Sequence, residues 1–184
     1  ANASGVASQI AMLLNSEKFS QVKEKVIETP EKEVKLTDKP RIGVLICHCG
    51  INIGKYVDVP KVVEKISALP NVIHCEDNLY SCSSDSQERI KELIKEKNLN
   101  RFIVASCTPR THESLFQETC LEAGLNKYLF EMVNIRDQCS WVHMTEKEEK
   151  KKKAMDLIRM AVSKARLLQP QEEENLKIEP TALV

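Results

Sequence analysis

The chain has 184 residues, 42% of them hydrophobic, so it can bury one core and needs neither disulfides nor a metal to fold. Its 27 basic and 27 acidic side chains give a formal net charge of +0, which argues against nucleic acid or an anionic membrane as a partner. The apolar stretch at residues 10–14 is too short for a signal core or a membrane span, and we expect a cytoplasmic protein. Thiols stay reduced there, so the seven cysteines favour metal ligation or redox chemistry over disulfides.

Residues 1–40 precede the part of the chain that has domain-like patterning. Val6, Ile10 and Leu13 recur at helical spacing and predict a helix, whereas residues 15–40 are polar and charged without an apolar pattern. No apolar segment lies nearby in the sequence to cover this helix. We therefore expect a helix and a polar linker, rather than the beginning of a domain.

Residues 41–144 alternate between strand and helix patterns. Apolar runs predict strands at 42–46, at a shorter stretch from Val72, at 102–105 and at 128–133. Asp58 predicts the start of one intervening helix, and capping-box spacings that begin at Ser84 and Asp85 predict another. Because strands that alternate with helices imply right-handed crossovers, we predict an α/β fold with a small doubly wound sheet of about four parallel strands.

Beyond residue 144 the pattern changes. Residues 146–168 carry an apolar stripe at helical spacing, which predicts one long helix that ends at Pro170. An acidic linker and an apolar terminal stretch follow. We therefore divide the chain into a helix with a polar linker at 1–40, an α/β cluster-binding unit at 41–144, and a long helix with a following linker and strand at 145–184.

Five of the seven cysteines follow apolar runs that are typical of strands. In a parallel sheet the carboxyl ends of the strands open into one shared crevice, so thiols far apart in sequence can converge there. Cys47 and Cys49 follow the first strand, and Gly50 allows the backbone to turn sharply and expose both thiols. The sequence thus predicts a metal site at this edge, with ligands drawn from Cys47, Cys49, Cys82, Cys107 and Cys139.

Two of these cysteines lie where a helix is predicted to begin. Cys82 directly precedes a run of capping serines, where the helix dipole favours a thiolate. Cys107 closes the third strand in a similar setting, and Arg110 in the following turn is available to hold negative charge nearby, as a cofactor-binding residue. Cys139 follows a polar connection, and Trp141 beside it can shield a cofactor from water.

The type of metal centre is less specific than its place. Four thiolates in a partly dry crevice suit an iron–sulfur cluster or zinc, and the C-x₂-C pairs of zinc ribbons and ferredoxins are absent. A single cysteine is more often a packing residue than a ligand, and Cys75 and Cys120 fit that alternative best. The four histidines more often orient loops, so none is assigned as a ligand.

Four motifs carry these cysteines. They are Cys47-His48-Cys49-Gly50, Glu76-Asp77-Asn78-Leu79-Tyr80-Ser81-Cys82-Ser83, Cys107-Thr108-Pro109-Arg110-Thr111-His112-Glu113 and Gln138-Cys139-Ser140-Trp141-Val142-His143. Together they resemble the A-subunit family of heterodisulfide reductases, over residues 41–168 of this chain. The resemblance implies a small domain that carries a 4Fe-4S cluster and precedes a thioredoxin-reductase-like FAD domain.

The same resemblance implies electron relay within cytoplasmic assemblies. Family members work with B and C subunits and with hydrogenase or formate dehydrogenase modules, where flavin chemistry divides electron pairs between acceptors of different potential. FAD is expected in the full-length protein only. Residues 181–184 resemble the first strand of that flavin domain, and residues 1–14 resemble the last helix of a preceding one.

We therefore predict an electron-transfer domain of a heterodisulfide reductase-like oxidoreductase, which is not catalytic by itself. Four of the five cysteines would hold the cluster, and the surrounding loops would tune its potential. One alternative is a thiol redox module that uses Cys47 and Cys49 as a dithiol pair without metal. A second alternative is a metal-free docking domain, in which the cysteines are packing residues.

Overall fold

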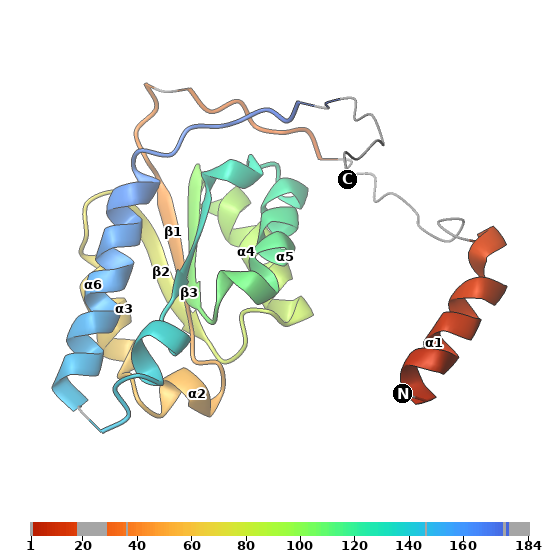
Figure 1. Ribbon diagram of the computed structural model, residues 1–184. Coiled ribbons are helices and arrows are strands. Elements are labelled where there is room, and N and C mark those ends of the chain that lie inside the picture. Colours follow the sequence, from red (N-terminus) through yellow and green to blue (C-terminus); the bar gives the residue numbers. More distant parts are fainter. Residues whose placement is uncertain (1, 18–28, 36, 146, 175, 177–184) are drawn as a thin grey trace.

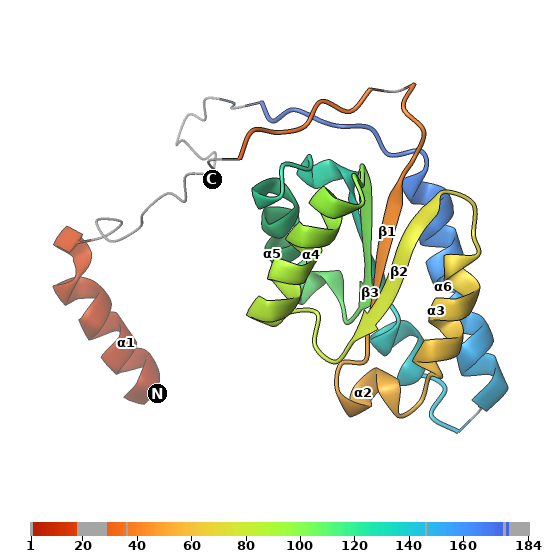
Figure 2. The ribbon, with the colours of Figure 1, turned by 180° about the vertical axis from the view of Figure 1, so that it is seen from behind.

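The structure is a computed structural model that describes residues 2–17, 29–35, 37–145, 147–174 and 176. It confirms the predicted α/β class: four parallel strands form one sheet in the order β2-β1-β3-β4, with helices on both faces (Figures 1 and 2). The strand predicted at residues 181–184 lies outside the described residues.

The described elements follow the predicted alternation. In chain order they are α1 (Asn2–Leu13), the 3₁₀ turn η1 (Asn15–Glu17), β1 (Ile42–Cys47), α2 (Ile51–Gly54), α3 (Val59–Ser67), β2 (Val72–Asn78), α4 (Ser84–Glu96), β3 (Arg101–Ser106), α5 (Pro109–Glu122), the 3₁₀ turn η2 (Lys127–Leu129), β4 (Phe130–Asn134), the π-helical turn η3 (Arg136–Ser140) and α6 (Lys147–Ala165). None of the residues of α1 is buried, as expected for a helix without an apolar neighbour.

The two central strands separate two hydrophobic cores. Because neighbouring side chains of a strand point to opposite faces, Val44 and Ile46 of β1 pack with α3 and α6, whereas Leu45 packs with α4 and α5. Every residue of β1 and β3 is buried. This explains why both strands are continuous apolar runs in the sequence, and it leaves only loops at the ends of the sheet for polar chemistry.

Two helix starts illustrate what local sequence predicts well. Asp58 caps α3 as predicted, since its side chain accepts a hydrogen bond from the N–H of Lys61. The cap of α4 is Ser83 rather than Ser84 or Asp85, and it accepts from the N–H of Ser86 at 3.4 Å. Consecutive serines offer several equivalent caps, so the spacing alone was one residue off.

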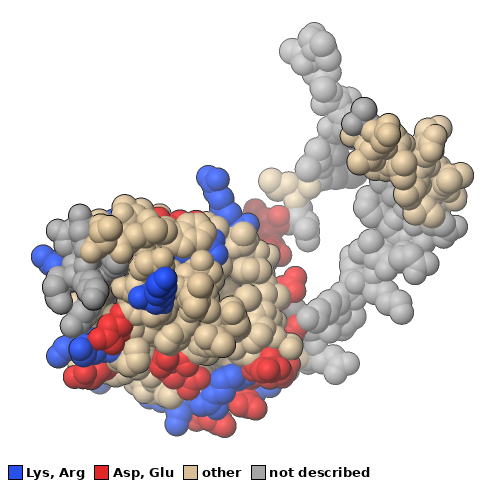
Figure 3. Space-filling view, turned by 90° about the horizontal axis from the view of Figure 1, so that it is seen from below, with Lys and Arg blue, Asp and Glu red and all other residues tan. Residues whose placement is uncertain are grey.

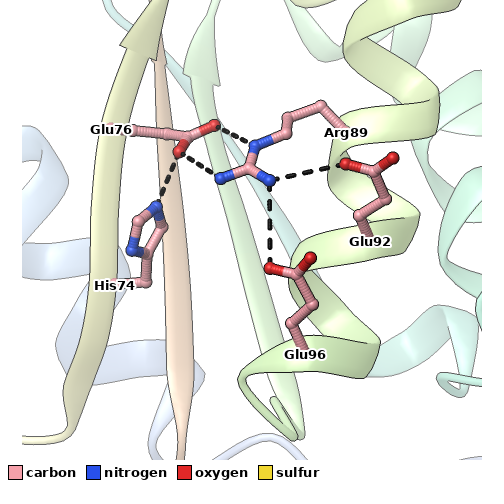
Figure 4. Close-up of polar contacts among 5 residues, drawn as sticks. All are labelled: His74, Glu76, Arg89, Glu92 and Glu96. Atoms are coloured by element: carbon pink, nitrogen blue, oxygen red, sulfur yellow. Dashed lines mark hydrogen bonds and ion pairs between the residues drawn. The ribbon is translucent and has the colours of Figure 1, made fainter.

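The edge strand β2 is longer and more polar than predicted. It spans seven residues, and His74, Glu76 and Asp77 interrupt its apolar pattern. Figure 4 shows Glu76 between His74 and Arg89, and Arg89 also pairs with Glu92 and Glu96 from α4. Charged groups of this kind discourage another strand from pairing with the open edge.

The chain enters and leaves this unit at the end of the sheet opposite α2. Residues 29–35 and 168–174 run side by side there (Figures 1 and 2). The buried side chain of Asn126 donates hydrogen bonds to Glu31 and to the carbonyl of Gln171, both at 2.9 Å. The carboxyl ends of the strands, with the α2 and η3 loops, are therefore remote from both connecting segments.

Candidate metal centre

Cys47 and Cys107 lie at the centre of the carboxyl edge. Cys47 is the last residue of β1, and Cys107 directly follows β3. These two strands are neighbours, with Ile46 opposite Ala105, and the strand order reverses between them. Such a switch point is where open α/β sheets place their ligands, because the connections on its two sides diverge and leave a crevice.

The loop after β1 brings Cys49 back over Cys47. Cys49 and Gly50 both have left-handed backbone conformations, with φ of 46° and 56°. A side chain at Gly50 would lie only 2.6 Å from the hydroxyl of Tyr80, so glycine is required there both for the backbone and for space. A positive φ is uncommon for cysteine, and strain of this kind concentrates at functional sites.

Backbone amides surround the sulfur of Cys47. The N–H of Cys49 donates to Sγ of Cys47 at 3.2 Å, and the N–H of Ser81 does so at 3.3 Å. The expectation that both loop thiols are exposed is wrong for Cys47, which is only 4% exposed because β1 extends through it. Cys49 is half-buried. Amide donors to sulfur favour the thiolate, which is the form that binds metal.

Cys82 joins this group from the loop before α4. Burial raises the pKa of Cys82, and the charges of Cys47, Cys107 and Cys49 raise it further. The expectation that the start of α4 favours a thiolate at Cys82 is therefore wrong, because desolvation and like charges outweigh the helix dipole. The same interaction shows that the four thiols from three separate loops lie close enough to influence one another.

Cys139 occupies a different setting from the other four candidates. It lies in η3, is fully buried, and belongs to the core cluster that contains Ile53 and Ile135. Cys49 packs against this cluster from the edge. Cys139 is thus placed behind Cys49, on the core side of the loop, and it does not contribute to the raised pKa of Cys82.

Cys75 and Cys120 have the surroundings of packing residues, as predicted. Cys120 is fully buried in the core beside Phe116, and burial raises its pKa. Burial likewise raises the pKa of Cys75 in β2 to about 12. Both thiols are therefore neutral at physiological pH and poor nucleophiles.

Two histidines near the edge pair with carboxylates. His48, between the two loop cysteines, lies 2.6 Å from Asp77 of the neighbouring strand, measured from Nε2 to Oδ2. His74 lies 2.7 Å from Glu76. These contacts agree with the expected role of histidine in orienting loops, and His48 thereby ties the Cys47–Cys49 turn to β2.

The positive charge at the thiols comes from a residue that sequence patterns did not single out. Arg110, the predicted candidate, is exposed in the first turn of α5. Arg136 instead donates from Nη1 to Sγ of Cys49 at 3.7 Å. A connection between them across 87 positions leaves no local signal, although the Arg136-Asp137 pair directly after a buried strand was one available hint.

The described residues include three buried polar side-chain atoms without a hydrogen-bond partner: Ser106 Oγ, Arg136 Nε and Asp137 Oδ2. All three belong to the carboxyl ends of β3 and β4 or to the turn that follows. Unsatisfied buried polar atoms are rare in native proteins and cluster at sites that bind something else. Their position marks the cysteine edge, and not another surface, as the candidate functional site.

Within the described ranges, no group of three or more His, Cys, Asp or Glu side chains is arranged to hold a single metal ion. The ligands of an iron–sulfur cluster bind separate irons at the corners of a cage, so they stand farther apart than ligands that share one ion. Thiols that interact electrostatically without converging on one point match the cluster arrangement better than a zinc site. The donor set, which is all sulfur with amide donors around it, is the kind that clusters take.

The fold and the edge define a class: a doubly wound α/β domain with cysteines gathered at its topological switch point. The chain is 52% identical over 147 residues to a protein from Archaeoglobus profundus that is described as like the A-subunit of heterodisulfide reductase, covering 80% of this chain and 21% of the relative. It is 49% identical over 154 residues to the A-subunit of the H(2):CoB-CoM heterodisulfide,ferredoxin reductase of Methanothermobacter thermautotrophicus, covering 84% and 23%.

A third relative is the iron-sulfur A-subunit 2 of the CoB–CoM heterodisulfide reductase of Methanopyrus kandleri, 50% identical over 147 residues, with 80% of this chain and 22% of the relative covered. The chain therefore belongs to the A-subunit family of heterodisulfide reductases, and it spans about a fifth of the length of the curated relatives it matches. No protein-family model matches it. Among the described helices, none has the length and apolar character needed to cross a membrane.

Proposed function

We propose that this chain is an electron-transfer domain that binds a 4Fe-4S cluster in a heterodisulfide reductase A-like flavoprotein. The observation that carries the proposal is the mutual charge interaction of Cys82 with Cys47, Cys49 and Cys107 at the carboxyl edge. These four are the proposed ligands, and Cys139 is the spare thiol in the core behind them. The name of the Methanopyrus kandleri relative, which includes the words iron-sulfur, supports the same kind of centre.

The cluster, when bound, supplies a carrier that accepts and releases one electron without making or breaking a bond to substrate. The residues of this chain hold and tune it. The amides of Cys49 and Ser81 donate to the sulfur of Cys47, and Asn52 Nδ2 lies 3.9 Å from Sγ of Cys49. Hydrogen bonds to the sulfurs stabilise negative charge, so they raise the reduction potential of a bound cluster.

An exposed apolar rim surrounds this edge and supports electron exchange with a partner protein. It consists of Ile51, Leu79, Tyr80, Trp141 and Val142, which are between 42% and 74% exposed. Figure 3, which views the molecule from this end, shows a broad surface without charged side chains. Exposed apolar residues that gather in one place mark interaction sites on soluble proteins.

We assign this rim to contact with partner subunits. The proposed partners are the B- and C-type subunits and the hydrogenase or formate dehydrogenase modules, and FAD is bound only by the full-length protein. The names of two relatives include ferredoxin, which makes a soluble electron carrier a further candidate. The divisions at 1–40, 41–144 and 145–184 stand as proposals for the order of units in the longer chain.

Anaerobic reconstitution with iron and sulfide tests the proposal. We expect about four irons and four sulfides per chain, with a paramagnetic signal after reduction by one electron. Cys47→Ser, Cys49→Ser, Cys82→Ser and Cys107→Ser should each lower cluster content strongly. Cys139→Ser and the matched core variant Cys120→Ala should keep it.

The other outcomes separate the rival functions. If the wild-type chain takes up neither iron nor sulfide, the cluster proposal is wrong. A dithiol titration that then shows a reversible Cys47–Cys49 disulfide would favour the thiol redox module. Loss of the cluster in Cys139→Ser, with retention in one of the four other variants, would keep the function but change the ligand set.

A further inference from the structure

Arg136 is the cation that lies against the candidate cluster site. Its Nη1 atom donates to Sγ of Cys49 at 3.7 Å, and its charge also interacts with Cys107. Burial disfavours the charged form of Arg136, but the contacts with Cys49 and Asp137 outweigh it, so the pKa is raised from its ordinary value. The guanidinium is therefore a permanent charge that faces thiols from two different loops.

The turn that contains Cys139 holds this side chain in place. The guanidinium lies over the ring of Trp141, 4.4 Å from the ring centroid, and the N–H of Trp141 donates to the carbonyl of Arg136 at 3.0 Å. Only 18% of the Arg136 side chain is exposed. A planar guanidinium that is stacked on an indole and shielded from water keeps one orientation and acts through a lower dielectric than a surface charge does.

Asp137 modifies this charge without cancelling it. Asp137 Oδ2 lies 3.3 Å from Nε of Arg136, yet the pair is not aligned as a hydrogen bond, and both atoms are buried without a hydrogen-bond partner among the described residues. The Nη1 end of the fork remains directed at Cys49. The side of the guanidinium that faces the sulfur is thus the side that the carboxylate does not occupy.

We infer that Arg136 is a positioning residue that holds Cys49 and raises the reduction potential of the cluster bound at this edge. The inference rests on the proposed function. When one electron enters a cluster, the site gains one negative charge and no bond is made, so a nearby fixed cation stabilises the reduced form more than the oxidised form. Trp141 contributes by keeping the guanidinium in place and excluding water.

The test is a redox titration of the reconstituted chain, followed by its paramagnetic signal. Arg136→Met should lower the reduction potential by an amount that corresponds to about a tenfold change in the equilibrium constant, or roughly 59 mV for one electron. Arg136→Lys, which keeps the charge but loses the fork and the stacking, should recover part of the shift. The matched control Arg159→Met, on the exposed face of α6, should leave the potential unchanged.

Each outcome has one meaning. If the Arg136→Met protein holds a cluster at the wild-type potential, the inference is wrong while the proposed function stands. If Arg136→Met loses the cluster, the potential of Arg136→Lys decides, because a value below wild type supports the inference and an equal value refutes it. If wild-type protein forms no cluster, the proposed function fails first.

Discussion

The backbone N–H of Ser81 donates a hydrogen bond to the sulfur of Cys47 over 3.3 Å, although 34 positions separate the two residues. This contact joins the end of β1 to the loop that delivers Cys82. A shift of either loop would therefore move two candidate ligands together. Metal binding at this edge depends on the relative position of β1 and β2, and on the protonation of the thiols that they carry.

Metal uptake by the cluster-free chain should strengthen as pH rises. Burial, together with the charges of Cys47, Cys107 and Cys49, raises the pKa of Cys82, so this thiol must release a proton when it binds metal. Co²⁺ titrations followed by thiolate-to-metal absorption measure the effect. Cys82→Ser should weaken binding and flatten the pH profile, and a wild-type profile that is already flat above neutral pH would contradict the prediction.

Arg101→Met should destabilise the fold by about 3 kcal/mol, because it leaves buried carbonyls without donors. The guanidinium of Arg101 is buried and donates to the carbonyls of Ala165 and Leu168, at and just beyond the end of α6. It thus satisfies acceptors that every helix end leaves open. Urea unfolding measures the loss. The exposed Arg159→Met should change stability by less than about 0.5 kcal/mol, and equal effects in the two variants would refute this role.

The chain should lose stability in acid through Glu76. Although burial by itself would raise the pKa of Glu76, hydrogen bonds from Arg89 and His74 outweigh it and hold the pKa below its ordinary value of 4.5. A depressed carboxyl pKa contributes stability that is present above 4.5 and is lost as pH falls through the lower value of the folded state.

Arg89→Gln tests this relationship, since it removes the main ion pair shown in Figure 4. Unfolding free energies measured from neutral pH down to about pH 3 should fall less steeply in the variant than in the wild type. Lys61→Gln, which removes an exposed pair with Asp58, is the control. Parallel curves for wild type and Arg89→Gln would show that Glu76 does not carry the acid sensitivity.

Asn126→Ala should release the two segments that run together across the amino end of the sheet. Its side chain bonds both Glu31 and Gln171, and its Oδ1 also accepts from the N–H of Tyr128 at 3.1 Å. Loss of these buried bonds should cost about 2 kcal/mol in unfolding free energy. Limited proteolysis should cut residues 29–35 and 168–174 faster than in the wild type. Gln169→Ala, exposed in the same segment, should leave the cleavage rate unchanged.

Local patterns were sufficient for the strands and for the edge at which the thiols lie. The runs that became β1 and β3 are apolar throughout because both faces of each strand are covered, and that burial is visible in the sequence itself. Helix starts were predicted to within a residue, as Asp58 and Ser83 illustrate. The polar edge strand β2 was underestimated, because its contacts with α4 replace the apolar alternation that marks a strand.

The sequence by itself determined the α/β class and the placement of five cysteines after strands, because hydrophobic periodicity and chain order dictate which ends of parallel strands meet. Only the tertiary structure decided that Cys139 lies in the core and that Arg136, rather than a residue close in sequence, faces Cys49. Those relationships depend on how separate loops pack over the sheet. Packing between loops follows from three-dimensional shape, and leaves no periodic trace in the chain.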